Sequence, residues 1–364
     1  YTTLFRSEEV FMGLIFSASE ITERSTGLTF DDVLLMPRHC EITSRTIPSL
    51  EAKLTKNKMI KVPFIASNMD TITEYEMAAK MSKIGGHGIL HRFMTIEKQV
   101  EMVKHLLELR GSDTHRHISA SVGVKEEGMR RTDALADAGV EILTLDIAHG
   151  DSVMMLETLA YIKKTHPHID VIAGNVAMPN GVQRFIDTGA DAVKVGIGPG
   201  SMCTTRIITG CGVPQLTAIA LCVSQARKHD IPVIADGGIK TSGDIVKALA
   251  VGANTVMLGS MLSGTLETPG EIHGGMKKYR GMASKDAQVS WRGNMQQGMA
   301  AEGESRMIAC KGSVENVIHE LSGGVRSGMT YLNAKTLAEI NTNGLFMEMS
   351  TNGIGESRPH GMNS

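Results

Sequence analysis

The sequence predicts an α/β protein in which eight strands and their helices form a (β/α)8 barrel. Three observations support this: short apolar runs recur eight times, helix-like stretches separate them, and 364 residues exceed the roughly 250 that such a barrel needs. Most of the runs are continuously apolar, which is typical of parallel strands buried on both faces. A closed TIM barrel is therefore expected, and an open doubly wound sheet is the alternative. The predicted strands cover residues 63–67, 88–92, 118–124, 142–148, 170–176, 192–198, 232–238 and 255–260.

Amphipathic stretches between the strands supply the crossover helices that a parallel sheet requires. Examples are residues 96–109, 153–164 and 216–228. Two connections are longer than the others: the loop after the sixth strand, and the segment that separates the eighth strand from the next helix, near residues 314–321. Loops at the carboxyl ends of barrel strands usually hold the chemistry, so we expect a catalytic loop after strand six and a flap after strand eight.

These features predict one catalytic domain over residues 27–364, which includes a flap over about residues 271–313 and a C-terminal tail. Residues 1–26 match no part of the repeat. We expect an N-terminal leader there, for which disorder is one option.

Composition excludes several classes of protein. Lys plus Arg number 37 and Asp plus Glu number 39, so the chain lacks the basic excess that nucleic acid or an anionic membrane attracts. The early apolar run at residues 10–18 is about half the length of a membrane span. Five cysteines without any CxxC spacing are typical of reduced thiols. We therefore expect a cytoplasmic protein without a nucleic-acid or membrane partner.

Polar residues follow several of the predicted strands. Because the carboxyl ends of barrel strands ring one mouth, these residues converge in space although they are scattered along the chain. A single Asp or Asn in such a place often only caps the next helix. Helix capping is a weaker explanation for the whole set of polar residues than for one of them. The set comprises Asn68, Met69 and Asp70 after strand one, Asp146 and His149 after strand four, Asn175 after strand five, and Asp236 after strand seven.

Glycines end the last two strands, which read Asp236-Gly237-Gly238 and Gly259-Ser260. Glycine lets backbone N–H groups approach a ligand closely, and the loops after strands seven and eight are the recurrent phosphate site of barrels. A phosphorylated small molecule is therefore expected. An ionised Asp236 beside the phosphate can accept hydrogen bonds from two ribose hydroxyls.

The loop after strand six carries Cys203 among glycines, close to Arg206. A thiolate held in such a polar loop can act as a nucleophile. The alternative is a small apolar filler, which is the role expected of Cys222 on its helix face. We predict that Cys203 is the nucleophile.

Several longer motifs occur in a characteristic order, and through them the chain resembles the inosine monophosphate dehydrogenase and GMP reductase family from about residue 27 to 360. The motifs are LTFDDVLLMP (28–37), ASNMDT (66–71), AGNV (173–176), KVGIGPGSMCTTR (194–206), IADGGI (234–239), VMLGS (256–260), KKYRGM (277–282) and GGVRSGMTY (323–331).

The resemblance implies covalent chemistry in both branches of the family: the Cys203 thiolate adds to C2 of a purine nucleotide, and hydride moves between C2 and a nicotinamide. The dehydrogenase hydrolyses the intermediate with an Arg-Tyr pair in its flap, and residues 281–303 contain no such pair. The reductase forms the intermediate by expelling ammonia from GMP, with a glutamate and the threonine two residues after the cysteine, which match Glu302 and Thr205.

We therefore predict an NADPH-dependent GMP reductase that produces IMP and ammonia, with Cys203, Thr205 and Glu302 as its catalytic residues. An IMP dehydrogenase without regulatory CBS modules, which converts IMP and NAD to XMP and NADH, is the alternative, since KKYRGM and GGVRSGMTY are similar to that branch. ASNMDT and DIAHGDS are similar to the reductase. A third hypothesis is a nucleotide-binding protein without turnover.

The resemblance also implies the remaining roles, although Ala283 and Met299 stand where the reductase pattern has serine and arginine. The resemblance implies a homotetramer that binds GMP and IMP. It also implies a site for K⁺. Substrate binding falls to Ser201, Asp236, Gly237, Gly238, Gly259, Ser260, Tyr279, Gly281, Met282 and Ala283, cofactor binding to Asp146, Ile147, Ala148 and Gly198, and a monovalent cation to the carbonyls of Gly198, Gly200 and Cys203.

Overall fold

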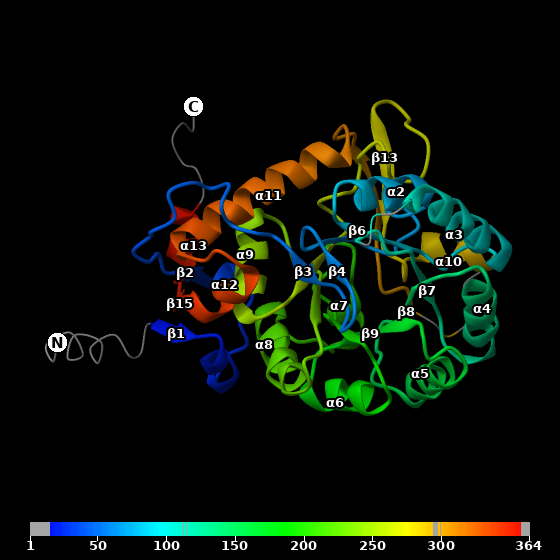
Figure 1. The fold of residues 1–364 in the computed structure, drawn as a ribbon, viewed down its shortest axis with the longest axis horizontal. Coiled ribbons are helices and arrows are strands. Elements are labelled where there is room, and N and C mark those ends of the chain that lie inside the picture. The colour runs from blue at the N-terminus through cyan, green and yellow to red at the C-terminus, as the bar shows by residue number, and fades with distance from the viewer. Residues whose placement is uncertain (1–14, 112, 114, 294–297, 299, 358–364) are drawn as a thin grey trace, which may run out of the picture.

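The computed structural model describes residues 15–111, 113, 115–293, 298 and 300–357, and it confirms the predicted barrel (Figure 1). Eight parallel strands of this part of the chain close in the order β5 to β12, so neighbours in sequence are neighbours in the barrel. Each strand lies within a predicted run or begins one residue before it. The strands are β5 Phe64–Ala66, β6 His87–Leu90, β7 Ser119–Val122, β8 Ile142–Asp146, β9 Asp170–Val176, β10 Ala192–Val195, β11 Val233–Asp236 and β12 Thr255–Leu258.

The crossover helices surround this barrel, and the three examples predicted from amphipathic stretches are present (Figure 1). None of the helices within the described residues combines the length and apolarity needed to cross a membrane. The helices are α2 Tyr75–Lys83, α3 Ile96–Arg110, α4 Lys125–Asp137, α5 Val153–Thr165, α6 Pro179–Asp187, α8 Gln215–Ala226, α9 Ser242–Val251 and α11 Val314–Tyr331.

Helix α11 extends ten residues beyond the segment predicted for it, which ended at residue 321. Glycines in its second half lower intrinsic helix propensity and hide the helix from sequence analysis. Two of them are needed for packing against α9, because a Cβ at Gly324 would overlap the Ser242 hydroxyl. A Cβ at Gly328 would lie 2.7 Å from a methyl group of Val246. Close approach of two helices therefore outweighs propensity here.

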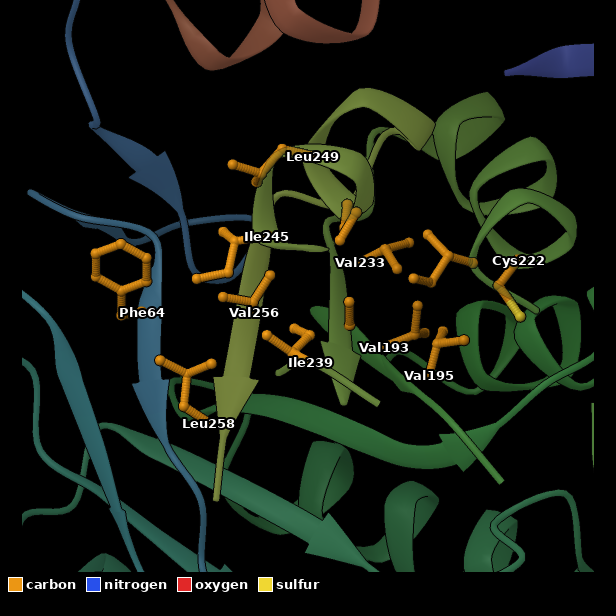
Figure 2. Close-up of a cluster of buried hydrophobic side chains, with 14 of the residues drawn as sticks. Phe64, Val193, Val195, Cys222, Val233, Ile239, Ile245, Leu249, Val256 and Leu258 are labelled. Carbon is orange, nitrogen blue, oxygen red and sulfur yellow. The ribbon is translucent and has the colours of Figure 1, made fainter. Parts of the chain in front are cut away.

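The strands read as continuous apolar runs because both of their faces are buried. Ile65, Ile172 and Ile234 point into the barrel and form an inner cluster. Their chain neighbours, such as Val233, pack in the outer layer between strands and helices. Part of that layer is seen in Figure 2, where Val233 lies near Leu249 and the other labelled side chains of the cluster.

Both ends of the described chain meet in a small sheet outside the barrel. Strand β1, Ile15–Ser17, pairs with β15, Leu345–Glu348, which also pairs with β2, Val33–Leu35. The rings of Phe16 and Phe346 stack 5.9 Å apart. Of the expected leader, residues 1–14 lie outside the described residues, whereas its remainder includes β1 and a 3₁₀ turn, Ser19–Glu23.

A buried histidine in the barrel makes stability depend on pH. His87 on β6 is 1% exposed, and burial, with a smaller effect of the charge of His117, lowers its pKa from 6.5 to about 3. The folded state keeps the ring neutral while the unfolded state protonates it below pH 6.5. This contribution to stability is therefore complete above pH 6.5 and is lost as pH falls toward 3.

We expect the free energy of unfolding to fall by about 1.4 kcal/mol per pH unit below 6.5 through this group. Urea unfolding of the wild type and of His87→Leu between pH 7.5 and 5 measures the effect, and the variant should lose this part of the slope. Identical slopes in the two proteins would contradict the assignment.

Candidate active site

The three predicted catalytic residues lie together at the mouth of the barrel. The Cys203 thiol donates to Oγ1 of Thr205 at 3.1 Å, and the Thr205 hydroxyl donates to Oε2 of Glu302 at 2.7 Å. Thr205 begins the short helix α7, Thr205–Thr209, in the loop that follows β10. A sulfur, a hydroxyl and a carboxylate thus form one continuous chain of hydrogen bonds, along which a proton can move.

Backbone hydrogen bonds between the flap and the catalytic loop bring Glu302 to this position. The N–H of Thr204 donates to the carbonyl of Glu302 at 3.0 Å, and the N–H of Glu304 donates to the carbonyl of Met202 at 2.9 Å. A Cβ at Gly281 would lie 2.9 Å from that same Met202 carbonyl. Glycine is therefore required for the flap to approach the loop. The flap consists of β13 Met276–Arg280, α10 Lys285–Arg292 and β14 Ser305–Ala309.

One pocket gathers the catalytic residues and every predicted substrate-binding residue. Gly237 and Gly238 line it with φ of 95° and 81°, a conformation that favours glycine. Tyr279 shares a hydrogen bond of 3.2 Å with Ser201. Burial raises the pKa of Tyr279, against the smaller opposite effect of that hydrogen bond, so its phenol stays protonated and can donate to an anion.

A second pocket adjoins the first. Asp146, Ile147 and Ala148 line it, as predicted for a cofactor, whereas Gly198 lines only the first pocket. The residues common to the two pockets are Ser67, Met69, Ala148, Asn175, Asp236, Met257, Met282 and Ala283. The two pockets are therefore contiguous, an arrangement that allows ligands in them to lie next to each other, as hydride transfer requires.

The family model for the IMP dehydrogenase / GMP reductase domain matches residues 27–360 of this chain. The chain belongs to this family. An inosine-5'-monophosphate dehydrogenase from Cryptosporidium parvum is 42% identical over 92% of this chain and 95% of the relative. One from Nitrosopumilus maritimus is 35% identical over 93% and 99% of the two chains. A GMP reductase from Trypanosoma brucei, solved with guanosine 5'-monophosphate, superposes with a TM-score of 0.88 at 31% identity, over 94% of this chain and 99% of its own.

Lys194 is a buried cation of this family member that sequence analysis did not single out. Its side chain is 3% exposed, and its Nζ lies 2.7 Å from Oδ1 of Asp146 and 2.8 Å from Oδ2 of Asp236. Burial lowers the pKa of Lys194, but the two carboxylates outweigh burial and hold that pKa above its ordinary value. A lysine inside an apolar run was the available signal, because a buried lysine needs anionic partners.

The same cation sets the charge of the carboxylate that faces the second pocket. Burial raises the pKa of Asp146, but the attraction of Lys194, with smaller contributions from Arg92 and Asn68, outweighs burial and holds that pKa below its ordinary value. The Asn68 amide donates to Oδ2 of Asp146 at 2.9 Å. Asp146 is therefore an ionised acceptor at neutral pH.

Replacing Lys194 by methionine is expected to lower the free energy of unfolding by about 3 kcal/mol at neutral pH, because two partly buried carboxylates then lack their buried cation. Urea unfolding measures this, and the deficit should shrink on acidification as the Asp146 carboxylate becomes protonated. The matched control is Lys240→Met, which removes an exposed pair with Asp31 and should cost less than about 1 kcal/mol. Equal losses of unfolding free energy in the two variants would contradict the conclusion that burial makes the Lys194 ion pairs contribute more than an exposed pair.

The remaining polar residues at the strand ends have different surroundings. Asn175 donates to Oδ2 of Asp236 at 2.9 Å and so orients the carboxylate expected to hold ribose. Asp70 forms an ion pair of 2.5 Å with Arg280, which ties β13 of the flap to the barrel. His149 is exposed and lines neither pocket. Met299 lies outside the described residues.

Ser67 is a further residue that sequence analysis missed. It is 5% exposed, its hydroxyl has no hydrogen-bond partner among the described residues, and it lines both pockets. A buried hydroxyl without a partner is unfavourable, so a ligand at the junction of the pockets would satisfy it. The motif ASNMDT, which contains it, was the available signal.

The three residues predicted to hold a cation lie in the turn before α7. The carbonyl of Gly200 accepts the N–H of Cys203 at 3.0 Å. A carbonyl oxygen has a second lone pair, so this hydrogen bond is compatible with a hard cation. The cation stays a prediction.

Proposed function

We propose that this protein is a GMP reductase, which converts GMP to IMP and ammonia with NADPH. The observation that carries the proposal is the chain of hydrogen bonds from Cys203 through Thr205 to Glu302. A carboxylate linked to the nucleophile through a hydroxyl suits a reaction in which a protonated amine leaves. The absence of an Arg-Tyr pair from residues 281–303 supports the same branch of the family.

The proposed chemistry has two steps, and Cys203 takes part in both. Its thiolate forms a bond to C2 of GMP, and the C2–N bond then breaks as the amino group leaves as ammonia, with a proton delivered along Thr205 and Glu302. When bound, NADPH supplies a hydride to C2. The C–S bond then breaks, which returns the Cys203 thiolate and releases IMP. The net change converts GMP, NADPH and two protons to IMP, NADP⁺ and ammonium, and the enzyme is returned unchanged.

The pocket supports the binding roles expected for the substrate. The loops at Gly237 and Gly259 and the hydroxyls of Ser201 and Tyr279 offer donors to a phosphate. Asp236, held by Lys194, offers a carboxylate to the ribose hydroxyls. Backbone groups of the flap segment Gly281, Met282 and Ala283 reach the base.

The second pocket fits the nicotinamide half of a dinucleotide. Asp146 is an ionised acceptor for a ribose hydroxyl, and the unpartnered hydroxyl of Ser67 is available to a polar group at the junction. We assign NADPH as the cofactor together with the reductase reaction. K⁺ at Gly198, Gly200 and Cys203 belongs to the same proposal.

The other expectations stand as proposals of the same kind. A catalytic domain over residues 27–364 is supported by the family match, which covers residues 27–360. A homotetramer is retained from the resemblance. The cytoplasm is proposed because all five cysteines are free thiols in the described structure.

An assay of the two nucleotide and cofactor pairs tests the proposal. We expect GMP to oxidise NADPH and release ammonia, and we expect IMP with NAD to give little NADH. No oxidation of NADPH by GMP, with or without K⁺, would overturn the proposal.

The second candidate is an IMP dehydrogenase. The names of the Cryptosporidium and Nitrosopumilus relatives favour it, at 42% and 35% identity. It predicts NADH formation from IMP and NAD in the same assay. A nucleotide-binding protein without turnover would bind GMP or IMP and transfer no hydride with either pair.

A further inference from the structure

The flap contributes one face of helix α10 to the second pocket. Ala287, Gln288 and Trp291 line the pocket, and Trp291 follows the other two by four and three residues, spacings that bring it next to both on one side of the helix. None of the three belongs to the motifs through which the chain resembles its family. The pocket therefore has a wall whose chemistry the proposed function has not yet used.

Two aromatic rings form most of this wall. The ring of Trp291 meets that of Phe93 edge-on, with centroids 6.5 Å apart and planes at 85°. Phe93 is itself fixed on the barrel: its ring stacks on that of buried His91 at 6.3 Å, and the Arg92 guanidinium lies 4.8 Å from its centroid. A ring on the rigid barrel and a ring on the flap thus meet beside Asp146, which lines the same pocket.

Two further observations indicate that a ligand completes this wall. Trp291 is 36% exposed, although a large aromatic side chain gains most from burial. Gln288 donates through Nε2 to the Ala283 carbonyl at 3.2 Å, whereas its Oε1 is buried and has no partner among the described residues. A ligand that fits this wall would have a flat ring with an N–H donor beside it, and a nicotinamide with its carboxamide group has both features.

The geometry points to Trp291 and Phe93 as an aromatic wall that holds the nicotinamide half of the cofactor, with Gln288 accepting from the carboxamide. This inference rests on the proposed function in that it takes a nicotinamide dinucleotide as the ligand. It adds three specificity-determining residues, two of them on the flap. Because the flap also carries Glu302, cofactor binding and placement of the catalytic carboxylate share one segment.

Trp291 is the only tryptophan of the chain, so its fluorescence reports on this wall directly. With IMP present, which NADPH does not reduce in the proposed reaction, titration of the wild-type protein with NADPH should quench the tryptophan emission in a saturable manner. Calorimetry should give a Kd for NADPH that rises about tenfold in Trp291→Ala and stays near the wild-type value in Trp291→Phe, which keeps an aromatic ring. The Kd for GMP should be unchanged in both.

Tyr331→Ala is the matched control, because Tyr331 is an exposed aromatic residue that lines neither pocket. It should bind NADPH like the wild type. Unchanged NADPH affinity in Trp291→Ala, or unchanged emission at saturating NADPH, would overturn the inference while leaving GMP reduction intact. Failure of the proposed function would differ: neither NADPH oxidation by GMP nor NADPH binding would be observed in the wild type. If NAD then bound and quenched the Trp291 emission, the aromatic wall would still bind the cofactor, and the reaction would be that of the dehydrogenase.

Discussion

Turnover by Cys203→Ala is expected to fall by roughly 10⁴-fold or more, because the variant cannot form the covalent bond on which both proposed steps depend. The substitution removes only the sulfur, and the glycines and hydroxyls of the nucleotide pocket stay in place. The Kd for GMP should therefore remain close to that of the wild type. Steady-state oxidation of NADPH and calorimetric binding of GMP measure the two quantities.

Cys211→Ala is the matched control for this variant. Cys211 lies in the same loop, it is exposed, and its thiol donates to the carbonyl of Thr209 at 3.7 Å. Its alanine variant should turn over like the wild type. Full activity in Cys203→Ala would refute the covalent mechanism, and equal losses in both variants would indicate a general effect on the loop.

Glu302→Gln is expected to lower kcat by about 10²–10⁴-fold, because an amide still accepts the hydrogen bond of Thr205 but cannot supply a proton to departing ammonia. The bond between Thr205 and Glu302 is 2.7 Å long, so an amide of the same shape fits the place. Hydride transfer itself does not use this proton. Transfer of deuterium from IMP labelled at C2 to oxidised cofactor should therefore be retained.

The control for this variant is Glu304→Gln, which lies two residues further along the flap. The Glu304 side chain points to Arg306, at 2.7 Å, and its carboxylate is half exposed. We expect no change in kcat for it. If Glu302→Gln lost deuterium transfer together with ammonia release, the carboxylate would position the loop and not act as a proton donor.

The barrel was predictable because its signal is local. Most strands are short runs in which one residue, such as Ile234, enters the inner cluster and its neighbour Val233 enters the outer one, so most positions are apolar. Glycines at strand ends and the cysteine in its loop also mark the mouth. Helix α11 was predicted too short, because its glycines serve a contact with α9 that lies far away in sequence.

The small sheet outside the barrel was not predictable, for a related reason. Strand β1 has three residues and finds its partner near the other end of the chain, at Leu345–Glu348. A segment of that length has no periodicity of its own. Its pairing with β15 and the stacking of Phe16 on Phe346 hold it in place.

The sequence by itself determined the fold and predicted which residues gather around Cys203 and the glycine turns, since these depend on residue types at strand ends and on spacing along the chain. The tertiary structure alone decided which distant groups interact: the hydrogen bond of Thr205 to Glu302, the cation shared by Asp146 and Asp236, and the ring of Trp291 against that of Phe93. Hydrogen bonds, ion pairs and ring contacts act over a few ångströms. They exist only once folding has brought together residues that the chain keeps far apart.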